Sequence, residues 1–283
     1  MREAFLVGAA AEPAHSLCRV GSDLDHISHL ARESARFAAA VAEAAPVASV
    51  PTCPEWDADD LLWHLAEVQW FWGTIVRQAL QEPPPAEMRP ERPANRAELT
   101  SFYDAVSAEL ATALASSAPQ DRVWTWSGDH TVGFVRRRQA HEALIHRIDA
   151  ELTIGSRTPM DAQLSDDGID EALRVMYGHV PDWATLSPND SGVIRLQCSD
   201  TGSTWLVCLG RLTGTDPGDG TAVDEACLEV ADDSGGEAWA TLTGSAADLD
   251  CWLWRRPTVS TLERSGDDRL LDQLEAVIQP GID

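Results

Sequence analysis

The hydrophobic pattern of this chain changes once, after Gly155, from helical spacing to strand-like alternation. On the N-terminal side, apolar residues recur at intervals of three and four positions, which predicts amphipathic helices packed around a shared core. Helices are expected over residues 22–44, 57–80, 95–116 and 131–153. Helices joined in this way favour a four-helix bundle, whose interior is a normal place for a metal ion.

Local chemistry supports these helix boundaries. Asp57 is a good N-cap, and Asp60 adds negative charge at the positive end of the helix dipole. Asn95 is expected to cap the following helix in the same way. Residues 81–93 contain five prolines and predict a stiff connecting loop. Residues 49–56 contain two prolines and predict a stiff, extended segment before the Asp57 helix.

The C-terminal side is expected to form a smaller domain. A linking helix is predicted over residues 164–178, and two helices close the chain over 245–254 and 267–278. Short alternating segments lie between them, separated by turns rich in Gly, Asp and Ser, and they predict strands. The expected strands cover residues 193–198, 205–209, 226–230 and 238–242. This order is typical of a small α+β domain built on an antiparallel sheet.

The predicted fold class is therefore mixed, with a helical bundle followed by an α+β domain. A chain of 283 residues is long enough for two such domains. We place their boundary near residue 165. The predicted regions are a leader over 1–20, the bundle over 21–164 and the α+β domain over 165–283.

Charge and cysteine usage limit the classes of partner. The chain has 46 acidic and 21 basic residues, a net charge of -25, so neither nucleic acid nor an anionic membrane surface is an expected partner. The six cysteines form no C-x-x-C pair, which argues against a disulfide scaffold or a cysteine-zinc knuckle. We expect no signal peptide, and the sequence has no run of about 18 apolar residues. We expect a cytoplasmic protein with reduced thiols, either monomer or homodimer.

A candidate metal site comes from two of the predicted helices. Glu142 and His146 are four residues apart, so their side chains lie about one turn apart on one helix face. His141 points about 140° away from His146 and is not expected to join them. With His64 on the Asp57 helix, the set contains two imidazoles and one carboxylate, the usual ligands of an open catalytic zinc site. Spacing alone leaves two alternatives open: a surface ion pair at Glu142 and His146, and a core-edge histidine at His64.

Two motifs carry a family resemblance. Residues 50–65 match the pattern V-P-x-C-P-x-W-x-x-x-D-L-x-x-H-L, and residues 138–150 match R-x-A-H-E-x-x-x-H-R-x-D-A. Together they resemble the signatures of the mycothiol-dependent maleylpyruvate isomerase family. The C-terminal region is similar to sterol-carrier-type α+β domains.

The resemblance implies a DinB-like bundle in which His64, Glu142 and His146 hold zinc. It also implies mycothiol, the low-molecular-weight thiol of actinobacteria, as cosubstrate. Zinc would convert the bound thiol to a thiolate, which could add to a small electrophile. The expected activity is therefore that of a zinc-dependent, mycothiol-using isomerase or S-transferase. Nickel or iron would also suit two His and one Glu.

Further residues are candidates for binding substrate or cosubstrate. Arg138 is a candidate for holding a substrate carboxylate in the bidentate way that arginine favours, and Arg255 is a second candidate for an anionic substrate. Trp126, together with Trp124, is expected to form a wall of the pocket above the metal. Solvated arginines and a packing role at the bundle end are the alternative interpretations.

Other motif residues are assigned structural roles. Cys53 is expected to be a buried structural thiol, because no basic neighbour lowers its pKa, and Trp56 to pack where the helix begins. Asp60 and Asp149 are acidic candidates for orienting the ligands, but a solvated surface role is favoured for each.

Two alternatives to the enzyme remain at this stage. The first is a non-catalytic protein of the same fold that binds a metal or a small molecule, in which a fourth ligand, such as His141 or a cysteine, closes the site. The second is zinc-dependent hydrolysis, for which the sequence offers no obvious additional carboxylate as general base.

Overall fold

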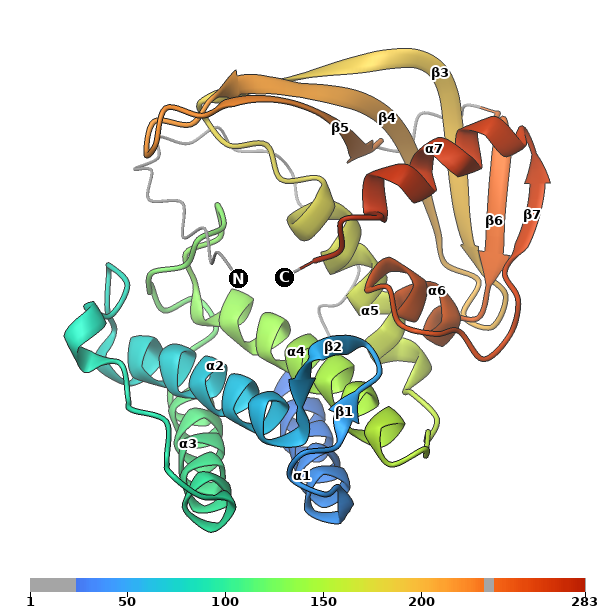
Figure 1. The fold of residues 1–283 in the computed structure, drawn as a ribbon. Helices are drawn as coiled ribbons and strands as arrows, with labels where there is room; N and C mark the ends of the chain where they lie inside the picture. Colours follow the sequence, from blue (N-terminus) through green and yellow to red (C-terminus); the bar gives the residue numbers. More distant parts are fainter. Residues whose placement is uncertain (1–23, 232–236, 283) are drawn as a thin grey trace. The chain divides into compact units, whose positions relative to one another are not determined.

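The computed structural model describes residues 24–231 and 237–282 and divides into two compact units, one ending at Pro159 and the other beginning at Met160 (Figure 1). The predicted leader, residues 1–20, lies outside the described part. Within that part, every helix is too short or too polar to cross a bilayer.

The first unit is a four-helix bundle, as the spacing of apolar residues predicts. Its helices are α1 His26–Glu43, α2 Ala58–Gln78, α3 Arg96–Ser116 and α4 Val132–Thr153. Helix α2 packs against α3, and α1 packs against α4. Their apolar faces meet in a core that includes Phe37, Leu65, Tyr103 and Ala150. The loop predicted to be stiff, residues 81–93, contains one short 3-10 helix, Ala86–Met88.

Capping side chains fix where the helices begin. The Asp57 carboxylate accepts hydrogen bonds from the backbone of Asp59 and Asp60, and the Asp60 side chain accepts one from the backbone of Asp57. This reciprocal arrangement satisfies backbone N–H groups that have no partner inside the helix. Asn95 caps α3 and Thr131 caps α4 through single hydrogen bonds of the same kind.

The proline-containing segment before α2 is a small antiparallel hairpin. Its strands are β1 Ser49–Val50 and β2 Cys53–Asp57. The prediction of an extended segment is correct, but the chain also folds back on itself at Pro51 and Thr52. Strand β2 ends at Asp57, the residue that caps α2, so hairpin and helix follow one another directly.

A buried ion network joins α1 to α4. The Arg147 side chain is 0% exposed, and its Nε lies 2.9 Å from Glu33 Oε2 on α1. Its Nη1 lies 2.9 Å from Glu151 Oε2 and donates to the Thr158 carbonyl at 3.1 Å. Removing one member of such a group leaves the remaining charges buried and uncompensated. The network therefore fixes the rotation of α4 against α1.

The second unit contains a five-stranded sheet and three further helices, as predicted for an α+β half (Figure 1). The strand order is β5-β4-β3-β6-β7, and neighbours run antiparallel except β3 and β6, which are parallel. The strands are β3 Ala184–Cys198, β4 Thr204–Thr215, β5 Ala222–Val230, β6 Ala240–Gly244 and β7 Glu263–Gly266. The helices are α5 Ala162–Glu171, α6 Ala246–Leu253 and α7 Asp268–Ile278.

Several details of this unit differ from the sequence prediction. The predicted boundary near residue 165 falls inside α5, which belongs entirely to the second unit. The single linking helix predicted over 164–178 changes after Glu171 into a π-helical segment, Ala172–Tyr177. Strand β7 was not predicted, because all four of its residues are exposed and none is apolar.

The ion network of the bundle predicts a large effect on stability. We expect Arg147→Met to lower the free energy of unfolding by about 3 kcal/mol, because Glu33 and Glu151 would lose their buried partner and keep only the partly exposed arginines Arg32 and Arg36. The matched control is Arg77→Met, whose pair with Glu109 is about half exposed on both sides, and which should cost about 1 kcal/mol or less. Urea unfolding of both variants measures this. Equal effects would contradict the role of the network.

Candidate metal centre

Three potential ligands converge inside the bundle. His64 comes from α2, and Glu142 and His146 come from consecutive turns of α4. One ligand atom from each lies within 4.8 Å of the other two. The Nε2 atoms of His64 and His146 lie 3.5 Å and 3.1 Å from Glu142 Oε1, and the two imidazole rings are 4.7 Å apart. Two imidazole nitrogens and a carboxylate oxygen at this separation fit a single divalent ion.

The exposure of the ligands increases toward α2. The His146 side chain is 9% exposed, Glu142 is 16% exposed and His64 is 29% exposed. Within the described residues the group has three members, so neither His141 nor a cysteine closes it. The His141 ring instead lies 6.1 Å from that of His26. This arrangement agrees with the prediction that His141 points away from the pair.

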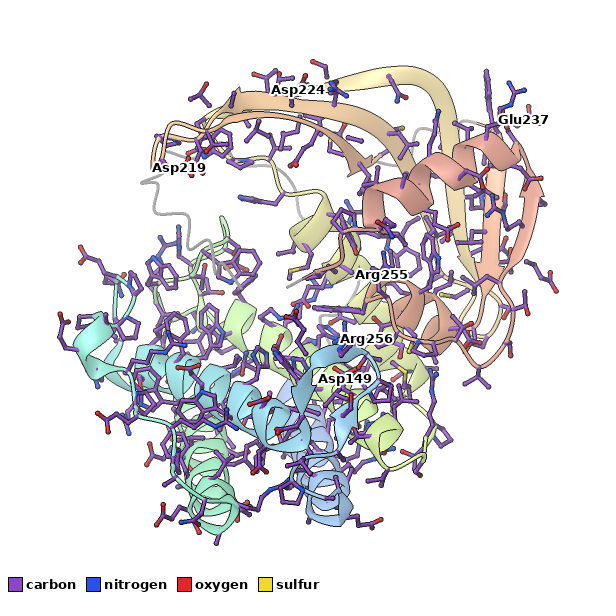
Figure 2. All side chains as sticks on the ribbon, viewed as in Figure 1. Asp149, Asp219, Asp224, Glu237, Arg255 and Arg256 are labelled. Atoms are coloured by element: carbon purple, nitrogen blue, oxygen red, sulfur yellow. The ribbon has the colours of Figure 1, made fainter. Side chains whose placement is uncertain are left out.

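The orientation of His146 is fixed by an aspartate on the next turn. His146 Nδ1 lies 3.0 Å from Asp149 Oδ2, which leaves Nε2 facing Glu142 and His64. Asp149 is fully buried in the bundle, and its other oxygen accepts a 2.6 Å hydrogen bond from Thr52 Oγ1 (Figure 2). The expectation of a solvated surface role for Asp149 is therefore wrong, because α4 turns this residue inward. A carboxylate behind a ligating imidazole is a frequent feature of metal sites.

Asp60, the other acidic candidate, does not act in this way. It belongs to the capping box of α2 and lies 2.5 Å from the Arg92 guanidinium, one third exposed. Burial raises its pKa, but the hydrogen bond and charge of Arg92 and the backbone N–H of Asp57 outweigh burial and lower it overall. Its role is that of a helix cap at the surface.

The protonation state of His146 is set by two neighbouring carboxylates, Asp149 and Glu142. Burial acts to lower the pKa of His146, but hydrogen bonds and charges from Asp149 and Glu142 outweigh it and raise the pKa to about 9. Burial acts to raise the pKa of Glu142, but His146, His64 and Arg138 hold it well below its usual range. At neutral pH the ring therefore carries a proton on Nε2, on the side where a metal ion would bind.

Arg138, predicted as a substrate-binding residue, contacts the candidate ligand Glu142. Its side chain is 4% exposed, and Nη2 lies 3.0 Å from Glu142 Oε2, one turn further along α4. This contact uses the carboxylate oxygen that does not face the imidazoles. Arg138 thus holds the Glu142 side chain in place and compensates its charge.

The aromatic ring that lies against the candidate imidazole ligands belongs to Trp56. The Trp56 ring on β2 lies 4.7 Å from the His64 ring and 6.5 Å from the His146 ring. Trp126 packs edge-on against Phe134, with ring centroids 5.4 Å apart. Phe134 lies about 12 Å from Glu142 along the axis of α4, at a rise of 1.5 Å per residue. Trp124 packs near the same end of the bundle, stacked on Trp72 at 6.2 Å. The sequence signal for Trp56 was its place in the first motif.

Arg255 belongs to the second unit and follows helix α6 (Figure 2). It has a positive φ of 58° and donates to the carbonyl of Gln279 in the C-terminal segment. Its expected role toward an anionic substrate stays a prediction. Cys53, on β2, is partly buried and free of disulfide bonds, consistent with a structural thiol.

Comparisons with known proteins agree with this architecture. Residues 27–151 match the family model of the mycothiol maleylpyruvate isomerase N-terminal domain. A search of curated proteins found no match. Among solved structures, the mycothiol-dependent maleylpyruvate isomerase is similar, with a TM-score of 0.55 and 12% identity, over 86% of this chain and 93% of that one.

A variant of that isomerase, with a histidine replaced by alanine, gives a TM-score of 0.54 and 11% identity over the same shares of the two chains. At such low identity, these structures establish the likeness of fold. The matched family model covers a range that contains α2, most of α4 and all three candidate ligands. Residues 27–151 of this chain thus match the N-terminal domain of the mycothiol maleylpyruvate isomerase family.

Proposed function

We propose that this chain is a zinc-dependent, mycothiol-using enzyme, an isomerase or S-transferase that acts on a small electrophile. The observation that carries the proposal is the convergence of His64, Glu142 and His146 from two helices, with ligand atoms within 4.8 Å of one another. Structural zinc sites use four protein ligands, whereas catalytic sites use three and leave a position for water or substrate. A three-ligand group among the described residues therefore supports a catalytic role.

The residues around the ligands support the same role. Asp149 orients His146, and Arg138 holds Glu142, so both side chains are positioned before a metal binds. His64 is the most exposed ligand of the three, which gives a thiol a route to the site from the α2 side. When bound, zinc lowers the pKa of a coordinated thiol so that it is a thiolate at neutral pH.

Addition of the thiol sulfur to an electrophilic carbon accounts for either outcome. Elimination after rotation about the former double bond would give an isomer, and retention of the new carbon–sulfur bond would give a thioether. Mycothiol is proposed as the thiol from the family model that residues 27–151 match and from the name of the similar isomerase. Arg255 is proposed as a contact to an anionic substrate, and Trp126 as a contact to the thiol.

The alternative is a non-catalytic protein that binds a metal or a small molecule through the same bundle. It would need no open ligand position, and a fourth protein ligand would favour it. The exposure of His64 and the three-membered group both favour the enzyme.

Metal content tests the site directly. We expect about one zinc ion per chain in tag-free protein after zinc reconstitution, since a three-ligand site holds one ion. The Glu142→Ala variant should lose the zinc ion, because only the two imidazole ligands would remain. The control is Glu109→Ala on α3, an exposed glutamate in a surface ion pair, which should keep its zinc. Mass spectrometry of the three proteins measures the ratio; a metal-free parent would sink the catalytic proposal.

Zinc binding should depend on pH. His146 must lose its Nε2 proton to bind a metal, and its pKa in the metal-free protein is about 9. The apparent affinity should therefore increase as pH rises from 6 toward 9, with proton release on binding. Calorimetry in buffers of different ionisation enthalpy measures both. An affinity independent of pH over this range would contradict binding through His146.

Turnover tests the thiol. We expect the zinc-loaded protein to accelerate the reaction of mycothiol with cis-configured dicarboxylic or other small electrophiles, and Glu142→Ala to fall to the rate of the uncatalysed mixture. Glutathione serves as the control thiol in the same assay. Zinc binding without acceleration for any electrophile tried would favour the non-catalytic alternative.

A further inference from the structure

The β1–β2 hairpin packs directly against His64 and is linked to His146 through Asp149. Trp56 on β2 packs its ring against His64 at 4.7 Å. Thr52, in the turn between the strands, reaches Asp149, which in turn contacts His146. The hairpin thus meets one ligand through an aromatic ring and the other through hydrogen bonds.

Resting on the proposed function, we propose that Thr52 and Asp149 form a hydrogen-bond relay that positions His146 to bind the metal ion. Thr52 Oγ1 donates to Asp149 Oδ1 at 2.6 Å, and Asp149 Oδ2 lies 3.0 Å from His146 Nδ1. Each carboxylate oxygen has one of these two partners. Both residues are positioning residues, because they act on the metal only through His146.

The relay follows from the needs of a buried carboxylate. Asp149 is 0% exposed, so its charge requires hydrogen-bond donors from the protein. If Thr52 supplies one donor, the Asp149 side chain is held in one rotamer, and Oδ2 faces the imidazole. The ring then keeps its proton on Nδ1 and presents Nε2 to the ion. Without the Thr52 hydroxyl, Asp149 Oδ1 would lose this donor, and the carboxylate would hold the His146 ring less firmly.

A purely structural role for Thr52 makes a different prediction. If its hydroxyl only anchored the hairpin, removing it would lower stability and leave the metal site unchanged. The relay predicts the opposite result: the loss of zinc-binding free energy should exceed any loss in the free energy of unfolding. The geometry of a bound ion provides a second readout, because cobalt in a zinc site absorbs visible light according to the arrangement of its ligands.

The experiment compares Thr52→Val, which keeps the shape and removes the hydroxyl, with Thr52→Ser, which keeps the hydroxyl. We expect Thr52→Val to weaken zinc binding roughly tenfold and Asp149→Asn roughly 10–100-fold, the range found for such outer partners. Thr52→Ser should bind as the parent does. Thr112→Val is the matched control, since Thr112 is exposed on α3 and its hydroxyl donates only to the backbone of its own helix.

The measurements are zinc dissociation constants by chelator competition, the visible spectrum of the cobalt-substituted protein, and the melting temperature of the metal-free protein. Weaker zinc binding with a changed cobalt spectrum in Thr52→Val, rescued in Thr52→Ser, would support the relay. Parent-like zinc affinity and cobalt spectrum in Thr52→Val would overturn the relay and leave the proposed function intact. A parent that binds neither metal would overturn both.

Discussion

Helix α4 carries charged side chains into the interior of the bundle, and every one of them requires a partner. Arg147 and Asp149 are fully buried, and Arg138 and Glu151 are nearly so. Desolvated charges persist only where opposite charges or hydrogen bonds compensate them. Neighbouring elements supply these partners: α1 contributes Glu33, and the hairpin contributes Thr52.

Because of this requirement, two different sides of α4 each make a set of polar contacts with neighbouring helices. On one side, the Arg147 network sets the rotation of α4 against α1. On another, Glu142 and His146 face His64 on α2. Because the helix is rigid, the rotation fixed by the first group also determines where the ligands of the second point. The stability of the fold and the geometry of the site therefore depend on the same constraint.

Much of the bundle could be predicted because its signals are local. Apolar spacing located the helices, side-chain chemistry located the caps at Asp57 and Asn95, and a separation of four residues placed Glu142 beside His146. Strand β7 was missed, since an exposed edge strand needs no alternation of apolar residues. Its pairing with β6 depends on contacts between distant segments.

The surroundings of the site were harder to predict, because they depend on which face of α4 is buried. Asp149 lies three residues after His146, and that spacing was a usable signal. Its direction toward the interior, however, is set by tertiary packing. Trp56 and Trp126 raise the same problem: two tryptophans in loops or strands are equivalent in sequence, and only the fold decides which one lies against the imidazoles.

The direct junction between hairpin and helix has a mechanical consequence. Strand β2 ends at Asp57 and α2 begins at Ala58, so no linker residue separates Trp56 from the helix that carries His64. The capping box locks this junction on both sides. The backbone that carries Trp56 and the helix that carries His64 must therefore move together. Under the proposed function, a reactant would approach His64 beside the Trp56 indole ring, and a backbone hinge that moves this ring aside would disturb the first turn of α2.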